Sequence, residues 1–446
     1  MRLRPTSPSP LGCAVTAIVT LLLIACQPLP RPSDQRARTV AVTAVTSSAV
    51  PQAQVVDATK PGEAQPRAFD TPTVHPDAAA WLKRVGLGPH AVAEEEWSQI
   101  QARARAEGYV LLYSDTSRSL NPIESLAQAY PGLRAEACTL GSQDIYLRLV
   151  DDLQEGEHAA GVYLVGDAPR TLKLLAQHQI WNYVPADLID VVPKELRAPL
   201  LVHHWSALTL VYNPTLAEAP PIDNWWDLTQ PEWRGRVALP DPTVDERTMY
   251  FLITLVQHSD ELAAAYRAEF DRALVLDADC PNAGYQWIKA LLANEPILVH
   301  SDAEVVDLVG GPEADEIRVG LCGYEQYDKV SRGELSFAPI LEAIPTAGLQ
   351  WPTYLALVDR CQRPNAAKLL VRWLMGDETG GEGYSAWHYP GFYPARTDVP
   401  DPKGAIPREE LLPRLWQPDA VYIDENMVAM RDFVAAHIGR RDVRGR

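Results

Sequence analysis

The stretch GYVLLYSDTSRSL, residues 108–120, decides the fold. Its apolar run YVLLYS is typical of a short buried strand, and a cluster of hydroxyl side chains follows directly. The helical pattern NPIESLAQAYPG comes next, then the strand LRAEACTL, the helix SQDIYLRLVDDLQEG and the strand AGVYLVG. Strands that alternate with helices at this spacing predict a parallel sheet with right-handed crossovers.

Polar side chains follow each of these three predicted strands. Ligands of parallel sheets bind at the carboxyl ends of the strands, close to helix N-termini. An ordinary turn or a helix cap explains the same residue types, so both interpretations stay open. The ligand-binding candidates of this part of the chain are Tyr113, Ser114, Asp115, Thr116, Ser142 and Asp167.

The bulk composition narrows the class of protein. The chain has 446 residues, which is more than one hydrophobic core usually serves, so two lobes are expected. A formal net charge of −18 argues against nucleic acid as the main partner. The motifs GxSxG, HExxH, SxxK and GxxxxGK[ST] are all missing from the sequence, which argues against a hydrolase or an ATPase.

The N-terminus resembles a bacterial lipoprotein signal. Arg2 and Arg4 precede the apolar run LGCAVTAIVTLLLIA, which ends directly before Cys26. We expect a signal peptide over residues 1–25, fatty acylation (palmitate) of Cys26, and a flexible tether to residue 75. A plain signal peptide with an incidental cysteine is the alternative. Either pattern places the protein outside the cytoplasm, and the first anchors it by lipid in the bacterial cell envelope.

Four further cysteines permit up to two disulfides in that oxidising compartment. The sequence does not separate the three full pairings, and buried free thiols fit equally well. None of the four belongs to a CxxC motif, which argues against a zinc site. They are Cys138, Cys280, Cys322 and Cys361.

Longer segments then point to a family. The segments EEEWSQIQARARAEGYVLLYS, IDNWWDLTQPEWRGRVALPDP, ALVDRCQRPNAAKLLVRWLMGDETG and GFYPARTD resemble, in this order, segments of bacterial extracellular solute-binding proteins. The resemblance covers roughly residues 92–400 and is to the type II periplasmic-binding group that includes ferric-iron-binding proteins.

This resemblance implies two α/β lobes joined by two crossing segments, with a ligand cleft between them. The implied protein is a membrane-tethered, monomeric, non-catalytic component of an ABC importer, without a cofactor of its own. It would capture a small ligand by lobe closure and deliver it to a permease that works with an ATPase subunit. A secreted enzyme with a diverged cleft is the alternative. The implied divisions are residues 76–205 for the first part of lobe 1, 206–324 for lobe 2, 325–404 for the return to lobe 1, and 405–446 for a C-terminal helical tail.

Ferric iron is the leading ligand implied by the resemblance. It is a hard cation that phenolate and carboxylate oxygens suit. Ferric-binding relatives often use an adjacent tyrosine pair, whereas the segment GYEQY separates its two tyrosines by three positions. A small organic cation on an aromatic-lined cleft, or an oxyanion, is the alternative. The metal candidates are Tyr113, Tyr324 and Tyr327, and the aromatic candidates are Trp205, Trp351 and Tyr354.

The second half of the chain supplies the remaining candidates. His204 falls at the expected crossing between the lobes and can bind a metal or a polar ligand. Packing at the hinge explains Trp205 equally well, and helix capping explains the Asp and Thr residues. The ligand-binding candidates from this half are Trp205, Ser206, Asp241, Thr243, Asp302 and Tyr324.

Overall fold

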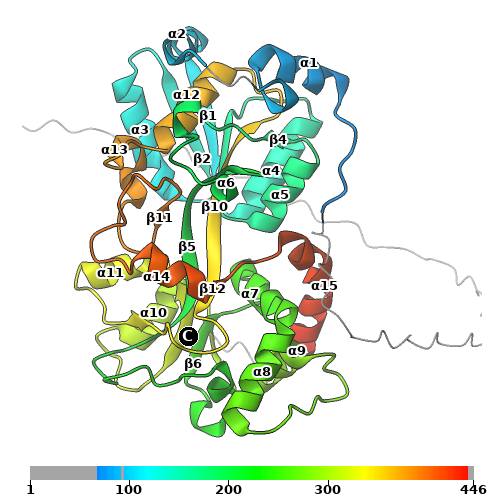
Figure 1. Cartoon of the computed structure of the whole chain (residues 1–446), viewed down its shortest axis with the longest axis vertical. Helices are drawn as coiled ribbons and strands as arrows, with labels where there is room; N and C mark the ends of the chain where they lie inside the picture. Colours follow the sequence, from blue (N-terminus) through cyan, green and yellow to red (C-terminus); the bar gives the residue numbers. More distant parts are fainter. Residues whose placement is uncertain (1–67, 92–94, 440–446) are drawn as a thin grey trace, which may run out of the picture. The chain divides into compact units, whose positions relative to one another are not determined.

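In the computed structural model, which describes residues 68–91 and 95–439, a mixed sheet organises the chain (Figure 1). Its main path has the strand order β2-β1-β3-β10-β5-β8-β6-β7. The predicted signal peptide, Cys26 and the predicted tether up to residue 67 lie outside the described residues. No described helix is long and apolar enough to cross a membrane.

The quoted stretch forms the first parallel part of this sheet. Strand β1 pairs in parallel with β2 on one side and β3 on the other, as the sequence predicts. The bounds are β1 (Tyr109–Ser114), α3 (Leu120–Ala129), β2 (Arg134–Thr139), α4 (Ser142–Gln154), β3 (Val162–Val165) and α5 (Ala168–Ala176). Gly108 stops the preceding helix, α2 (Trp97–Glu107), in the left-handed conformation with φ 70°.

A second parallel part lies in the other half of the sheet. Strand β6 pairs in parallel with both β7 and β8. The bounds are β6 (Val237–Pro240), α7 (Glu246–Gln257), α8 (Ser259–Phe270), α9 (Ala283–Ala293), β7 (Ile297–Val299), α10 (Asp302–Gly310) and β8 (Val319–Gly323).

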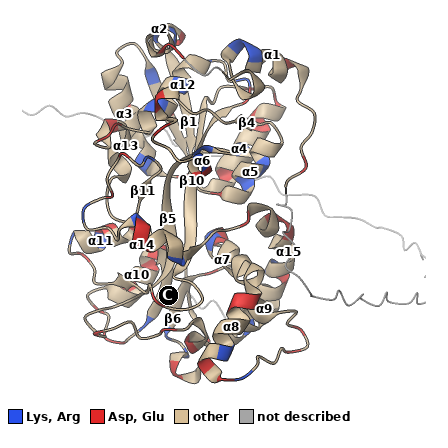
Figure 2. Cartoon of the chain, viewed as in Figure 1, with Lys and Arg blue, Asp and Glu red and all other residues tan. Residues whose placement is uncertain are grey.

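Two long antiparallel strands connect the two parts. They are β5 (Leu201–Tyr212) and β10 (Gly348–Val358), and Figure 1 shows both running from one part to the other. Neither strand contains a charged residue, as Figure 2 shows. Their close approach requires glycine at position 348, where a Cβ would lie 2.1 Å from the carbonyl oxygen of Leu208.

Each part has its own hydrophobic core, which is the physical basis of two lobes. The first core packs β1 and β3 against α12 (Pro364–Leu374), and the second packs α7 and α9 around Trp225 and Trp287. The residue limits predicted for the lobes stay a prediction. The C-terminal helix α15 (Ala420–His437) contacts α5, α7 and α9 and contributes Ile423, Met430 and Val434 to the second core.

The other elements are shorter or peripheral. Their bounds are α1 (Pro76–Val85), β4 (Ile180–Trp181), α6 (Lys194–Arg197), α11 (Asp328–Ser331), β9 (Ala338–Pro339), α13 (Gly381–Tyr384), β11 (Tyr393–Pro394), α14 (Arg408–Leu411) and β12 (Leu415–Trp416). The four described cysteines are free thiols, so the structure contains neither of the disulfides that the sequence permits. They are Cys138, Cys280, Cys322 and Cys361.

Candidate functional site

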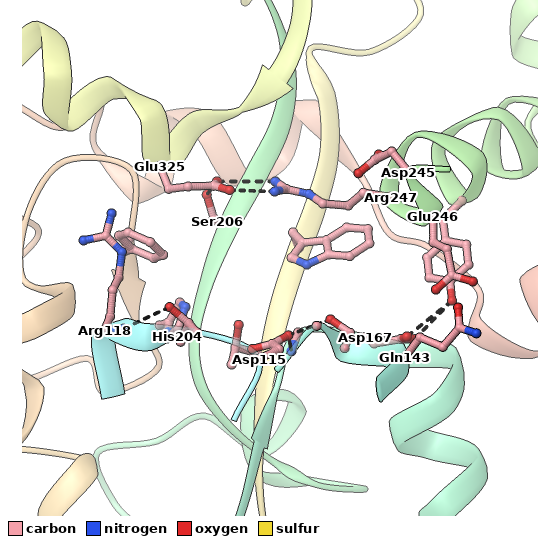
Figure 3. A pocket seen from close by; sticks show the side chains of 18 of the residues that line it. Asp115, Arg118, Gln143, Asp167, His204, Ser206, Asp245, Glu246, Arg247 and Glu325 are labelled. Carbon is pink, nitrogen blue, oxygen red and sulfur yellow. Dashed lines mark hydrogen bonds and ion pairs between the residues drawn. The ribbon is translucent and has the colours of Figure 1, made fainter. Parts of the chain in front are cut away.

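A cavity of about 630 Å³ lies at the carboxyl ends of β1 and β3 and receives residues from both lobes. The starts of α4 and α7 and one face of β5 also line it, so two helix N-termini meet there (Figure 3). The lining residues are Asp115, Thr116, Arg118, Gly141, Ser142, Gln143, Asp144, Gly166, Asp167, His204, Ser206, Val244, Asp245, Glu246, Arg247, Tyr250, Glu325, Gln326, Trp351, Thr353, Trp387 and Phe392.

The structure brings five of the candidate ligand-binding residues together in this cavity. They are Asp115, Thr116, Ser142, Asp167 and Ser206. Ser142 does not cap α4, because Gly141 holds the N-cap position. Instead its hydroxyl donates to Asp115 Oδ2 at 2.9 Å, and the Gly166 N–H donates to the same oxygen at 2.8 Å. Burial nevertheless raises the pKa of Asp115.

Tyr113 and Ser114 do not line the cavity. Tyr113 is 2% exposed, and its hydroxyl donates to the carboxylate of Asp152 on α4. Burial and that hydrogen bond raise the pKa of the Tyr113 phenol. The Ser114 hydroxyl is turned to the backbone of Thr116 instead. Both residues end a buried strand, so packing decides where their side chains point.

Trp205 also lies outside the cavity, and the two-residue period of a strand explains why. His204 and Ser206 are two positions apart on β5 and share the face that lines the cavity. Trp205 lies between them and faces the opposite side, where its ring stacks on Tyr393 with centroids 4.2 Å apart.

Three acidic or hydroxyl candidates of lobe 2 have local structural roles. Asp241 Oδ1 accepts hydrogen bonds from the backbone N–H and hydroxyl of Thr243 in an exposed turn, at 2.8 and 2.7 Å. The cap of α7 is Asp245, whose Oδ1 accepts the Thr248 N–H at 2.7 Å. Asp302 begins α10 behind the cavity wall, where its Oδ2 accepts the Gly323 N–H at 3.0 Å.

The three metal candidates are not brought together. Tyr113 belongs to the first core, whereas Tyr324 and Tyr327 pack against each other with ring centroids 5.1 Å apart. None of the three lines the cavity, and the Tyr324 hydroxyl accepts the Ile406 N–H at 3.4 Å. The residue after Tyr324 that does line the cavity is Glu325.

Only one set of three His, Cys, Asp or Glu side chains among the described residues has ligand atoms close enough to share a metal ion, and it lies away from the cavity. It consists of Asp277, Asp279 and Cys280. The Lys289 ammonium pairs with both of its carboxylates, at 2.9 and 2.6 Å. These acids therefore already have a cation as partner.

A cluster of ion pairs joins the lobes at one side of the cavity. Arg170, on α5, donates to both carboxylate oxygens of Glu246 on α7, to Asp167 Oδ2 at 2.6 Å and to the Tyr250 hydroxyl at 3.0 Å. The Tyr250 hydroxyl donates to Asp167 Oδ1 at 3.2 Å. Burial opposes the charge of Arg170, but its hydrogen bonds outweigh that effect and raise its pKa.

A second buried cluster forms the lobe 2 wall. Arg247 Nη1 donates to Glu325 Oε1 at 2.6 Å and to Asp302 Oδ2 at 3.2 Å, and its guanidinium lies 5.1 Å from the Trp351 ring centroid. The Ser206 hydroxyl donates to Glu325 Oε2 at 2.9 Å. Burial raises the pKa of Asp302 to about 6, against the opposing effect of Arg247. The pKa of Glu325 is lowered, because its bonds to Arg247 outweigh burial.

Replacing Asp302 with asparagine is expected to stabilise the fold at neutral pH. A folded-state pKa of about 6, above the unfolded value of 3.8, means that folding favours the protonated carboxyl. This contribution to stability is present below pH 3.8 and is lost as the pH rises through 6. The asparagine variant keeps an acceptor for Gly323, so its advantage in unfolding free energy should grow to about 1–2 kcal/mol at pH 7.5.

Urea denaturation of both proteins at pH 4.5 and pH 7.5 checks this result. Asp307→Asn is the matched control, because Asp307 is an exposed acid on the same helix. A difference between Asp302→Asn and the original chain that is equal at the two pH values would contradict the expectation.

Arg118 is a cavity residue that the sequence analysis did not select. Its guanidinium lies 4.7 Å from the Tyr389 ring centroid and 5.3 Å from that of Phe392. Its nearest carboxylate is that of Asp328, 3.8 Å away, and its side chain is 37% exposed. The backbone N–H of Arg118 donates to Thr116 Oγ1 at 3.3 Å, whereas the guanidinium makes no hydrogen bond to another described residue. Burial lowers its pKa, although Asp328 and Glu325 act in the opposite direction. The charge of Arg118 is therefore only partly compensated by the protein.

Comparison with known proteins supports the architecture. No protein-family model matches the sequence, and no curated protein matches it. Among solved structures, iron-bound HitA from Pseudomonas aeruginosa is similar, with a TM-score of 0.58 and 16% identity over 73% of this chain and 99% of that chain. The ferric binding protein from Campylobacter jejuni has a TM-score of 0.53 and 15% identity over 74% of this chain and 100% of its own.

An extracellular solute-binding protein from Bordetella parapertussis is also similar, with a TM-score of 0.55 and 12% identity over 75% of this chain and 100% of that chain. At these identities the likeness concerns the fold. It agrees with two parallel half-sheets connected by β5 and β10 and with a cavity lined by both. The chain therefore has the type II periplasmic-binding fold, two α/β lobes joined by two crossing segments, of the kind found in ferric-binding proteins.

Proposed function

We propose that this chain is the solute-binding component of a bacterial ABC importer. It captures a small solute between its two lobes and delivers it to a membrane permease, while the lipid on Cys26 holds it in the cell envelope. The fold supports the binding role, because the similar solved proteins are binding proteins rather than enzymes. The N-terminal pattern supports the tether.

The ligand we infer is a small organic solute that carries an anionic group, and Arg118 is the observation that carries this inference. A partly desolvated guanidinium favours a carboxylate or several acceptors as partners, because burial removes part of its hydration. Arg247 and Arg170 have close partners of this kind, whereas the guanidinium of Arg118, whose side chain is 37% exposed, has the Asp328 carboxylate at 3.8 Å. An anionic group in the cavity would supply the missing partner.

Acidic side chains and an amide gather at the opposite end of the cavity. Figure 3 places Arg118 and His204 at one end and Asp245, Glu246 and Gln143 at the other. Glu246 pairs with Arg170 and Asp245 Oδ1 accepts the Thr248 N–H, so the Gln143 carboxamide and the second carboxylate oxygen of Asp245 can accept hydrogen bonds from a donor group of the solute. The aromatic faces of Trp351 and Tyr250 lie along the same wall and suit its apolar portion.

Ferric iron is the second candidate, because proteins of the same fold such as HitA are solved in an iron-bound form. The cavity favours it less, since none of Tyr113, Tyr324 and Tyr327 lines it. Its buried carboxylates also already accept hydrogen bonds. Asp167 and Glu246 pair with Arg170, and Glu325 pairs with Arg247.

A thermal-shift panel on the purified mature chain, with native mass spectrometry of what co-purifies, tests this function. The panel contains small carboxylates, amino acids, polyamines, phosphate, and ferric salt with and without citrate. Anionic organic solutes should raise the melting temperature by a few degrees at concentrations near 100 times Kd, without being turned over.

Stabilisation by ferric salt alone, with a visible charge-transfer band that Tyr324→Phe abolishes, would overturn the organic ligand in favour of iron. Turnover of any compound in the panel would overturn the binding role itself. Stabilisation by polyamines alone would contradict the proposal that Arg118 binds an anionic group of the ligand.

A further inference from the structure

We propose that His204 is the specificity-determining acceptor of this cavity, and that the ligand presents a hydroxyl hydrogen next to the anionic group bound by Arg118. This inference rests on the proposed function and deepens it. It names the chemical class as hydroxycarboxylates or a protonated phosphate group.

A chain of hydrogen bonds fixes the tautomers of two adjacent histidines. His203 Nε2 lies 2.8 Å from the carbonyl oxygen of Leu374, and a carbonyl can only accept, so this nitrogen carries the proton. His203 is fully buried among rings, and burial lowers its pKa to about 4, so the neutral ring has a bare Nδ1.

The hydrogen bond between the two histidines then fixes the tautomer of His204. His203 Nδ1 lies 2.7 Å from His204 Nδ1, so the His204 nitrogen must donate. His204 is neutral as well, because burial lowers its pKa, and His203 and the positive Arg118 lower it further. Its Nε2 therefore carries a lone pair and no proton, and can only accept a hydrogen bond.

That acceptor belongs to the wall of the cavity. His204 is 4% exposed, and its ring lies between Phe392 at 4.9 Å and Trp387 at 5.9 Å, centroid to centroid. Because Nδ1 is turned to His203, the Nε2 edge is the one left for the cavity, and it has no partner among the described residues. A ring that is more than nine-tenths buried and has one unused acceptor favours a ligand that places a hydrogen-bond donor against that acceptor.

Arg118 and His204 act on the same part of the ligand, because both contact the ring of Phe392. The guanidinium requires an acceptor or an anion, and the imidazole requires a donor. The positive charge of Arg118 disfavours an ammonium as that donor and favours a hydroxyl. A carboxylate with a neighbouring hydroxyl meets both demands, and so does hydrogen phosphate, whereas sulfate has no hydrogen to donate at neutral pH.

Matched ligand pairs test the inference by isothermal titration calorimetry. Malate is compared with succinate, and phosphate with sulfate, so the two arms distinguish a hydroxycarboxylate from a phosphate. The member with the hydroxyl hydrogen should bind at least about tenfold more tightly in one pair, which is the discrimination expected when a buried acceptor is otherwise left unpaired.

The variant His204→Gln should reduce that ratio to less than about threefold, because a carboxamide can turn either its donor or its acceptor to the ligand. Its affinity for succinate or sulfate should change little. His300→Gln is the matched control, because His300 is exposed and does not line the cavity. It should leave the ratio unchanged.

Nitrogen-15 NMR of the imidazole rings tests the same point without a substitution. At pH 7 His204 should give the spectrum of a neutral ring protonated at Nδ1, and binding of malate or phosphate should shift its Nε2 resonance. A proton on Nε2 would overturn the inference. The inference would also be overturned if succinate and sulfate bound as tightly as malate and phosphate and that binding depended on Arg118. The proposed function would stand in that case. If no anion of either pair binds while another solute does, the anionic ligand class fails first.

Discussion

Replacing Arg170 with methionine is expected to lower the free energy of unfolding by about 2–4 kcal/mol at pH 7.5. Arg170 is the shared partner of Glu246 and of Asp167, whose side chain is 4% exposed. Methionine keeps much of the side-chain volume but leaves Asp167 without its cation, while Glu246 keeps its pair with the more exposed Arg431. Burial already raises the pKa of Asp167, so its charge is costly once Arg170 is removed.

Arg431→Met is the matched control for this prediction. Arg431 also pairs with Glu246, at 3.0 Å, but its side chain is 52% exposed, so its loss should cost less than about 1 kcal/mol. Urea denaturation of the two variants measures the difference. The loss in Arg170→Met should shrink at pH 4.5, because the raised pKa of Asp167 favours its protonation there, which removes the unpaired buried charge. Equal effects of the two substitutions would show that burial does not strengthen the Arg170 pair.

This ion-pair cluster also couples stability to binding. Arg170 belongs to α5 of the first lobe and Glu246 to α7 of the second, and Glu246 lines the cavity. A contact that joins the lobes at the rim of the cavity favours the arrangement in which both lobes can reach one ligand. The same substitution is therefore expected to weaken ligand binding as well as the fold.

The alternation of strands and helices predicted the parallel half-sheet of β1, β2 and β3. The cavity lies at the carboxyl ends of β1 and β3, where backbone topology alone favours ligand sites. The direction in which each side chain points was harder to predict. All twelve residues of β5 are buried, so hydrophobicity did not indicate which face meets the ligand. Trp205 therefore looked as good a candidate as His204 or Ser206.

The residues that precede a helix were a second source of difficulty in choosing site residues. Several Asp and Thr residues precede α7, and each is typical of an N-cap. The structure uses Asp245 as the cap and leaves Asp241 and Thr243 in an exposed turn. The next two residues, Glu246 and Arg247, line the cavity, but their partners Arg170 and Glu325 lie 76 and 78 positions away in the sequence. No local pattern predicts such a pair.

Arg118 lies within the stretch that decides the fold, among the hydroxyl residues that make this stretch a candidate ligand turn. Replacing Arg118 with glutamine is expected to weaken malate or phosphate binding by about 10- to 150-fold, which corresponds to about 1.5–3 kcal/mol for the loss of a charge-assisted hydrogen-bond partner at a partly exposed site. The fold itself should be unharmed, because the protein compensates this charge only in part.

Arg332→Gln separates this effect from a general loss of positive charge. Arg332 lies near the same carboxylate, Asp328, at 3.7 Å, but is 56% exposed and does not line the cavity. Calorimetric titration of both variants with the ligand that binds best in the matched pairs should show weakened binding for Arg118→Gln alone. Melting temperatures without ligand should stay within about 2 °C of the original chain for both. Arg118→Gln should bind the anion less tightly than the original chain if Arg118 holds the ligand. Equally tight binding would mean that the acidic end of the cavity holds the ligand, and it would favour a cationic ligand over an anionic one.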